Sequence, residues 1–352
     1  MSGPVLVTGA AGFIGSALTR ALLDAGRGVV AYDKLTYAGH RSSLADCEGR
    51  PGYVFIQGDI ADAEAVARTF QTHRPAAIMN LAAESHVDRS IDGPAAFIDT
   101  NVVGTLVLLQ AARTHVQTLD AAAADAFRFL HVSTDEVFGA LGDQGRFDEA
   151  TAYDPRSPYA ASKAASDHLV RAWGHTYGLP VLVTNCSNNY GPRQHPEKLI
   201  PLTVLRALLG QPLPIYGDGR QVRDWLHVDD HAQALIRVLE TGQVGRTYAV
   251  GGEAERTNLQ VVQGVCAALD AMAPRADGRP HAQAMTHVAD RPGHDRRYAI
   301  DPARIRDELG WSPRMGFEEG LAQTVRWYLD HEAWWEPILA NGQATRRQGL
   351  SV

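Results

Sequence analysis

The sequence predicts an α/β fold built on a doubly wound parallel sheet. Short apolar runs alternate with longer segments of helical spacing through the first half, and a glycine-rich turn follows the first apolar run. This alternation favours βαβ units with right-handed crossovers and strands buried on both faces. The expected strands are 5–8, 29–32, 53–56, 77–81, 127–132, 181–184 and 247–250, and the expected helices are 13–25, 61–73, 94–116, 159–177, 228–240, 301–309 and 317–329.

The composition of the chain changes after about Asn185, where prolines and glycines cluster and the expected helices and strands become shorter. A smaller C-terminal lobe that is interleaved with the sheet explains this change. We expect one domain of residues 1–187, about 229–256 and 301–330, and a lobe of about 188–228, 257–300 and 331–352. Residues 121–126 are expected to be a helix end or a loop, and the tail beyond Trp335 is expected to be peripheral.

Composition and charge exclude several classes of function. The 352 residues carry 33 basic and 40 acidic side chains, for a formal net charge of −7, and 45% of them are hydrophobic. This acidity disfavours nucleic acids or an anionic membrane as partners, so any anion must be held by a few placed groups. Three scattered cysteines fit neither a disulfide framework nor a metal site. With no targeting segment and no apolar run of ~20 residues, we expect a cytoplasmic protein.

The first expected strand leads into Gly9-Ala-Ala-Gly12-Phe-Ile-Gly15. Glycines there allow a tight turn and a close approach of the backbone to a pyrophosphate at a helix N-terminus, although the spacing is not the plain G-x-G-x-x-G. Asp33 ends the second strand, where a carboxylate can bind a ribose diol and would repel a 2′-phosphate, which favours NAD over NADP. Asp59-Ile60 and Leu81–Ser85 follow the next two strands. The sequence therefore predicts a Rossmann-type NAD-binding domain.

Tyr159-Ala-Ala-Ser-Lys163 opens an expected helix. Residues i and i+4 share one face of a helix, so the ammonium can lie near the phenol. An unperturbed tyrosine has a pKa of ~10, and lowering it by ~3 units takes ~4 kcal/mol, which a lysine and an oxidised nicotinamide could supply together. Lys163 is one of only three lysines among the 33 basic residues. We expect the pKa of Tyr159 to be lowered so that it acts as a base.

Ser133-Thr134-Asp135-Glu136 follows the fifth expected strand. Two adjacent acids at the carboxyl edge of a sheet can serve as a proton donor and a proton acceptor. The donor needs a raised pKa, which burial or a like-charged neighbour provides. An ordinary acid pair that caps a helix is the alternative reading.

Taken together, these segments resemble the extended short-chain dehydrogenases/reductases of the NAD-dependent epimerase/dehydratase group and, within them, the dTDP-glucose 4,6-dehydratase family. The resemblance runs from Val5 to about Leu329. Its most specific stretches are residues 33–39, 81–90, 133–139, 159–163, 185–192, 196–201, 223–229 and 290–295. The Thr-Asp-Glu triplet separates dehydratases from related epimerases. The chain departs from the family pattern at His40, where asparagine is expected, and at Arg193-Gln-His195, where Tyr-Gln-Phe is more usual.

The resemblance implies an NAD-dependent hydro-lyase acting on dTDP-D-glucose. Tyr159, assisted by Lys163 and Thr134, would remove the proton of the 4-hydroxyl while hydride passes from C4 to NAD⁺. Glu136 would take the C5 proton, and Asp135 would protonate the departing 6-hydroxyl. Hydride then returns to C6 and C5 is reprotonated, giving dTDP-4-keto-6-deoxy-D-glucose, with NAD bound throughout.

The motifs and the resemblance also imply the binding residues. The cofactor set is Gly9, Gly12, Phe13, Ile14, Gly15, Asp33, Lys34, Leu35, Thr36, Asp59, Ile60, Leu81, Ala82, Ala83, Ser85, Thr100, Tyr159, Lys163 and Asn189. The substrate set is Ser85, Thr134, Asn188, Lys198, Leu199, Pro214, Tyr216, Arg223, Asn258, Arg291 and His294. Lys198 and Arg223 can offset a diphosphate, and Tyr216 offers an aromatic face to a pyrimidine. The family further implies a homodimer built on helices 94–116 and 159–177.

Other functions stay open at this point. A UDP- or dTDP-sugar 4-epimerase would share Tyr159, Lys163 and NAD, but it would leave Asp135 and Glu136 without a role. A dehydratase could also act on another nucleotide hexose. A catalytically silent NAD-sensing regulator would have no need to keep the complete set of five catalytic side chains.

Overall fold

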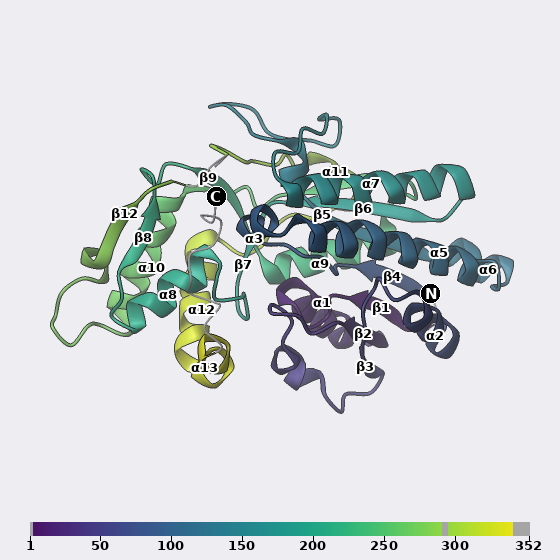
Figure 1. The fold of residues 1–352 in the computed structure, drawn as a ribbon, viewed down its shortest axis with the longest axis horizontal. Coiled ribbons are helices and arrows are strands. Elements are labelled where there is room, and N and C mark those ends of the chain that lie inside the picture. Colours follow the sequence, from purple (N-terminus) through teal and green to yellow (C-terminus); the bar gives the residue numbers. More distant parts are fainter. Residues whose placement is uncertain (1–2, 291–294, 341–352) are drawn as a thin grey trace.

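The computed structural model describes residues 3–290 and 295–340, and a seven-stranded parallel sheet forms the centre of this part of the chain (Figure 1). The strands are β1 (Val5–Thr8), β2 (Val29–Asp33), β3 (Tyr53–Gln57), β4 (Ala77–Asn80), β5 (Arg128–Thr134), β6 (Val181–Cys186) and β10 (Thr247–Val250). Their order is β10-β6-β5-β4-β1-β2-β3, and each neighbouring pair runs parallel. The predicted doubly wound α/β fold is confirmed.

Helices cover both faces of this sheet. α1 (Phe13–Asp24) and α9 (Val228–Thr241) pack on one face, and α2 (Ala63–His73), α5 (Thr105–Val116) and α7 (Pro158–Tyr177) on the other. Val5 and Val7 belong to the core on the α1 and α9 face, here called the first core, and Leu6 belongs to the core on the opposite face, beneath α2, α5 and α7. Side chains along a strand alternate in this way, and a strand buried on both faces must be apolar throughout.

The expected helix 94–116 is present as three consecutive segments. α4 (Pro94–Phe97) continues into a π-helical segment, Ile98–Gly104, and then into α5. Within the described residues, Pro94–Val116 alone is long and apolar enough to cross a bilayer, and 44% of its most apolar window is buried. It packs against α2 and α7. Core helices of soluble proteins pass the same test of length and composition, so this is weak support for a membrane span.

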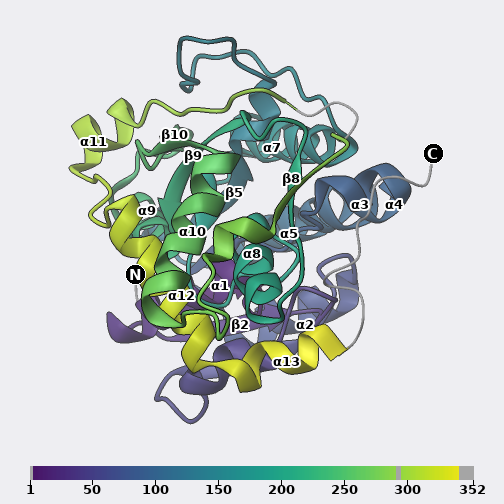
Figure 2. The ribbon, with the colours of Figure 1, turned by 90° about the vertical axis from the view of Figure 1, so that its left-hand side faces the viewer.

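The later part of the described chain adds two small sheets and a second core. β9 (Val222–His227) pairs with β7 (Asn188–Tyr190) and β11 (Glu255–Thr257), and β8 (Leu213–Tyr216) pairs with β12 (Met285–Val288). α8 (Leu199–Leu208), α10 (Asn258–Met272), α12 (Phe317–Asp330) and α13 (Glu332–Ala340) pack around this core. Figure 2 looks onto α10, α12 and α13 from this side. The remaining short elements are α3 (Val87–Asp92), α6 (Ala121–Ala126), α11 (Ala303–Leu309) and 3-10 turns at Arg41–Cys47, Asp135–Phe138 and His281–Ala284.

The C-terminal tail differs from the expectation as far as the structure describes it. Beyond Trp335, Ile338 of α13 is buried in the second core and Leu339 packs against it, so the expectation of a peripheral tail is wrong for these two residues. The indole N–H of Trp334 also donates to Ser43 Oγ at 3.3 Å. Apolar side chains on a helix of only nine residues give too little periodicity for its burial to be predicted.

Candidate active site

A cavity of about 310 Å³ lies along the carboxyl edge of the sheet. Residues that follow β1, β2, β4, β5 and β6 line it, as expected for ligand sites in open α/β sheets. Every residue of the predicted cofactor set except Leu35 lines the cavity. Leu35 has a φ of 58° and packs against the first core instead.

The glycine turn after β1 is built for close backbone contact. Gly9 has a φ of 66°, and the N–H of Gly12 donates to the Gly9 carbonyl at 3.1 Å. A Cβ on Gly15 would lie 2.0 Å from that carbonyl oxygen, so only glycine fits there. No side chain caps the N-terminus of α1. Its first N–H groups are therefore available to an anion such as a pyrophosphate.

Asp33 occupies the position expected of a ribose-binding acid. Its Oδ2 accepts from the Ala11 N–H at 2.8 Å and its Oδ1 from the Leu35 N–H at 2.7 Å. Burial raises the pKa of Asp33, and these backbone donors oppose the rise. Each carboxylate oxygen keeps a lone pair beside the cavity. Lys34 pairs with Asp59 at 2.5 Å on the same wall. The turn and the acid together fit NAD.

The five predicted catalytic side chains all line the same cavity. Thr134 ends β5, and its Oγ1 accepts from the Glu136 N–H at 3.3 Å. Tyr159 and Lys163 lie in the first turns of α7, which Ser157 caps by accepting from the Ala160 N–H at 3.0 Å. The structure therefore brings a Tyr–Lys pair and an acid pair to one space.

Burial sets the proton affinities of these groups. It raises the pKa of Asp135 well above its ordinary value, and the charges of Glu136 and Asp224 add to the rise. Asp135 is therefore held in the protonated form that a proton donor needs. Burial and the Glu136 charge also raise the pKa of Tyr159, although a hydrogen bond from Thr134 opposes this. The protein's own groups thus do not supply the lowered pKa of Tyr159 that we expected.

Several buried polar atoms of the cavity wall have no hydrogen-bond partner among the described residues. They are Ser133 Oγ, Asp135 Oδ2, Ser187 Oγ, Asn188 Oδ1 and Gln194 Oε1. Leaving a buried polar group unpaired costs about 1–3 kcal/mol. A polar ligand in the cavity would satisfy these atoms.

The predicted substrate set is only partly gathered here. Ser85, Thr134, Asn188 and Lys198 line the cavity, and Lys198 Nζ donates to the Ser85 carbonyl at 3.3 Å. Leu199, Pro214, Tyr216, Arg223 and Asn258 are not among its lining residues. Arg223 is 6% exposed and stacks on Tyr298, with its guanidinium carbon 4.3 Å from the ring centroid. Arg291 and His294 lie outside the described residues.

Sequence reasoning missed two acids and a histidine of the wall. Glu84, His195 and Glu197 line the cavity. Glu197 lies 3.4 Å from Arg89 Nε, and burial raises its pKa. Both acids lie inside segments that the motifs had already singled out, 81–90 and 196–201, and an acid within such a segment was the signal available.

The fold and the cavity together define a dinucleotide-dependent enzyme of the extended short-chain dehydrogenase/reductase class. A sequence model described as GDP-mannose 4,6 dehydratase matches residues 6–324. A dTDP-glucose 4,6-dehydratase of Xanthomonas campestris is 58% identical over 99% of both chains, and dTDP-glucose 4,6-dehydratase 1 of Escherichia coli K12 is 56% identical over 94% of both. The chain belongs to the dTDP-glucose 4,6-dehydratase family, whose members are hydro-lyases.

Solved structures agree with this assignment. The Streptomyces venezuelae dTDP-glucose 4,6-dehydratase with NAD bound shares 47% identity, with a TM-score of 0.86 over 95% of this chain and 99% of that one. The Bacillus anthracis enzyme in complex with NAD shares 41%, with a TM-score of 0.84 over 96% and 100%. The prediction of NAD as cofactor is thereby confirmed for the family. A Thermus thermophilus UDP-glucose 4-epimerase is also similar, at 31% identity and a TM-score of 0.81 over 93% of this chain and 99% of that one.

Proposed function

We propose that this protein converts dTDP-D-glucose to dTDP-4-keto-6-deoxy-D-glucose with NAD as a tightly held cofactor. One observation carries the proposal: Tyr159, Lys163, Thr134, Asp135 and Glu136 line a single cavity together with the glycine turn after β1. Membership of the dTDP-glucose 4,6-dehydratase family supports the choice of reaction and of nucleotide.

Oxidation at C4 needs a base for the hydroxyl proton, and Tyr159 is the proposed base. When bound, NAD⁺ supplies a reversible hydride acceptor and a positive ring. Thr134 donates a hydrogen bond that favours the phenolate of Tyr159. Lys163 lies one turn after Tyr159 on α7. Its ammonium is anchored because it donates to the Val132 carbonyl at 2.8 Å. Thr134 opposes the effect of burial on Tyr159, and the role we propose for the Lys163 ammonium is to oppose it as well.

Elimination of water needs a proton acceptor at C5 and a proton donor at the 6-hydroxyl. Asp135 is 2% exposed and protonated because of burial, so we assign it the role of donor. Glu136 follows it in the same 3-10 turn and lines the same cavity, and we assign it the role of acceptor. Two adjacent acids in different environments can hold opposite protonation states, as this step requires.

The substrate lobe is proposed to consist of about 188–228, 257–300 and 331–352, with NAD held by 1–187, 229–256 and 301–330. Lys198 is the N-cap residue of α8. It is the proposed partner of a diphosphate because it is the positively charged member of the predicted substrate set that lines the cavity. Tyr216, Arg223 and Asn258 are proposed to reach the nucleotide from β8, β9 and α10.

A 4-epimerase is the alternative, since epimerases share the fold. It is less favoured because it would leave a protonated Asp135 and its neighbour Glu136 without a task. The test is to incubate the purified protein with dTDP-glucose and UDP-glucose separately and to weigh the products by mass spectrometry. We expect loss of one water from dTDP-glucose and the ultraviolet absorbance of a 4-keto sugar in alkali. Unchanged mass with formation of the C4 epimer would overturn the proposal.

We also propose that the enzyme is a cytoplasmic homodimer. The outward face of the segment 94–116 carries Ile98 and Val103, which are 48% and 40% exposed, beside the half-buried Val102 and Leu106. An apolar face of this kind on a long helix is typical of a subunit interface. The three cysteines are free and buried, which suits a reducing compartment.

A further inference from the structure

A buried acid lies on α7 in line with the Tyr–Lys pair. Tyr159, Lys163, Asp167 and Arg171 recur at intervals of four residues and so fall along one side of the helix. Asp167 is 0% exposed, yet the proposed reaction gives it no task. A buried carboxylate is costly unless hydrogen bonds and an opposite charge stabilise it. Its partners therefore show what it does.

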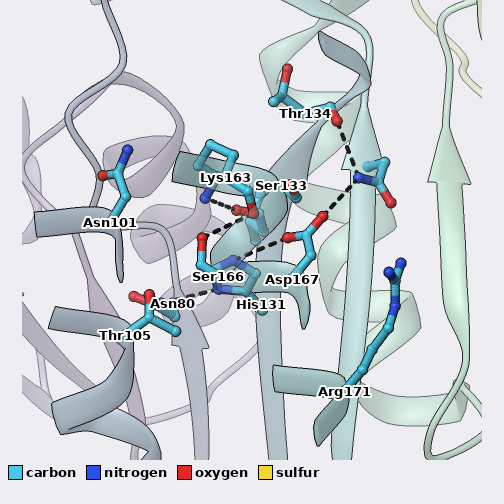
Figure 3. A network of polar contacts seen from close by, with 12 residues as sticks. Asn80, Asn101, Thr105, His131, Ser133, Thr134, Lys163, Ser166, Asp167 and Arg171 are labelled. Atoms are coloured by element: carbon cyan, nitrogen blue, oxygen red, sulfur yellow. Dashed lines mark hydrogen bonds and ion pairs between the residues drawn. The ribbon is translucent and has the colours of Figure 1, made fainter. Parts of the chain in front are cut away.

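Two neutral donors and an imidazole ring surround the Asp167 carboxylate. Its Oδ2 accepts from Tyr153 Oη at 2.7 Å and from Asn185 Nδ2 at 3.3 Å, and its Oδ1 lies 3.3 Å from His131 Nε2. Figure 3 shows the Asp167 carboxylate next to His131, and both His131 and Thr134 belong to β5. Burial alone would raise the pKa of Asp167, but His131, Lys163 and Tyr153 hold it below its ordinary value. The group is therefore ionised.

The tautomer of His131 is fixed by a chain of hydrogen bonds. Asn80 Oδ1 accepts from Thr8 Oγ1 at 2.7 Å, so the Asn80 amide nitrogen points to His131 Nδ1, 3.1 Å away. Nδ1 must then accept, and the ring proton sits on Nε2, which faces Asp167. Burial lowers the pKa of His131 to about 4, so this ring is neutral at pH 7.

Asp167 is linked to the catalytic strand through Asn185. The Asn185 Nδ2 that donates to Asp167 also lies 3.1 Å from the Thr134 carbonyl oxygen, and Asn185 is 0% exposed. Lys163 Nζ holds the Val132 carbonyl of the same strand. The end of β5 that carries Thr134 is thus tied to α7 at two points, one of which depends on Asp167.

Asp167 follows Lys163 by four residues on α7 and is also the negative charge that acts on it. Burial lowers the pKa of Lys163, and Asp167 opposes the fall. The other groups around Lys163 are neutral at pH 7: His131 on β5, and Cys186 on β6, whose pKa burial raises to about 12. Burial likewise raises the pKa of Tyr153, and Arg171 beyond it donates to the Tyr153 hydroxyl at 2.7 Å.

We propose that Asp167 is a positioning residue for this reaction: its carboxylate is the counter-charge that keeps Lys163 an ammonium beside Tyr159, and through Asn185 it fixes Thr134. This inference rests on the proposed roles of Tyr159 and Lys163. It explains why an ionised acid is buried at a place where an apolar side chain would cost less.

The first test is the pH profile of kcat for Asp167→Asn, which keeps the shape of the side chain and removes its charge. Without Asp167 the pKa of Lys163 falls further, so a smaller fraction of the lysine is charged at a given pH and the pKa of Tyr159 rises. We expect the ascending limb of kcat to move to higher pH by about one unit, toward the profile of Lys163→Ala. An unmoved limb, or one that moves to lower pH because the ammonium persists, would overturn the proposal.

Tyr153→Phe is the matched control, because it removes one hydrogen bond to Asp167 and keeps the charge. We expect a lower thermal midpoint and an ascending limb at the wild-type pH. If Tyr153→Phe moves the limb as far as Asp167→Asn does, hydrogen bonding and not charge controls Lys163, and the counter-charge is refuted.

A double-mutant cycle in thermal stability tests the pairing without turnover, and so separates it from any failure of the proposed reaction. Lys163→Met leaves Asp167 buried without its counter-charge. Adding Asp167→Asn to Lys163→Met should therefore raise the thermal midpoint, although Asp167→Asn lowers it or prevents folding in the wild-type background. If Asp167→Asn lowers the thermal midpoint in the Lys163→Met background, as it does in the wild-type background, the two charges do not depend on each other.

Discussion

At the scale of single residues, the division of labour between Asp135 and Glu136 follows from their surroundings. Asp135 is 2% exposed, and its Oδ2 has no hydrogen-bond partner among the described residues. Like charge from Glu136 and Asp224 makes its ionisation still more costly. A carboxyl group in this state can give a proton to a leaving hydroxyl at neutral pH. The neighbour is then free to act as the base.

Glu136→Gln tests this division. The amide keeps the size of the side chain but cannot accept the C5 proton, so oxidation at C4 should proceed while elimination stops. Loss of a general base typically costs about 10²–10⁴ in rate. We expect reduced nicotinamide to accumulate on addition of dTDP-glucose, with release of 4-keto-6-deoxy product lowered by that factor. Release of product at the wild-type rate would refute the assignment, and Glu136→Asp should restore part of the activity.

Lys163→Ala tests the ammonium beside Tyr159. Burial and the Glu136 charge already raise the pKa of Tyr159, so removal of the cation leaves little phenolate at neutral pH. Since raising the pH restores the phenolate, the loss of activity should be large near pH 7 and smaller at high pH. The measurement is kcat across the pH range. A deficit that is the same at every pH would instead indicate a structural role.

At the scale of secondary-structure elements, the sheet was predictable and much of the second core was not. β1 and β10 have the predicted bounds, because an apolar run between turn residues suffices for a strand buried on both faces. β8 and β12 pair with each other across a long stretch of sequence, so neither shows a local pattern. The proposed acid pair was predicted because it follows the end of β5, and Tyr159 and Lys163 because their spacing places them on one face of a helix. Tyr216, Arg223 and Asn258 depend on tertiary placement in the second core, which spacing does not encode.

The helix segment 94–116 carries the prediction that belongs to this scale. Val103 is 40% exposed on its apolar outward face, so Val103→Asp should leave the folded chain intact. In a dimer the same aspartate would be buried without a partner, at a cost of several kcal/mol. We expect sedimentation analysis to find two chains per particle for the wild type and one for the variant.

Val244→Asp is the control for this experiment, since Val244 is 44% exposed in the turn before β10, away from that helix. It should leave the assembly at two chains. Dissociation by both variants, or by neither, would place the interface elsewhere.

At the scale of the whole molecule, both departures from the family pattern fall at one junction. The rings of His40 and His195 stack with centroids 5.7 Å apart. Tyr37, from the loop after β2, meets His195 edge-on at 5.5 Å, and Trp334 of α13 meets His40 edge-on at 6.0 Å. Two imidazole rings thus pack together the loop after β2, the segment that carries Lys198 and helix α13. This packing requires both rings to stay neutral.

This junction makes the stability of the protein sensitive to acid. Burial lowers the pKa of His195 to about 3, and repulsion from His40 when that ring is protonated and from the charges of Lys198 and Arg89 adds to the fall. In the unfolded chain the same ring has a pKa of ~6.5, so between these values only the unfolded state binds the proton. His195 therefore destabilises the fold as the pH falls below ~6.5, by up to ~1.4 kcal/mol per pH unit.

His195→Phe removes this proton while it keeps a ring at the junction. From pH 7 to pH 5, the unfolding free energy of the wild type should fall by about 2 kcal/mol more than that of the variant. Other buried groups titrate alike in the two proteins and cancel in the difference. Urea unfolding of both at each pH is the measurement, and the interval from pH 7 to 8, where the difference should stay constant, is its control. A difference that does not change between pH 7 and pH 5 would mean that the folded protein accepts the proton on His195 and that the junction does not exclude charge.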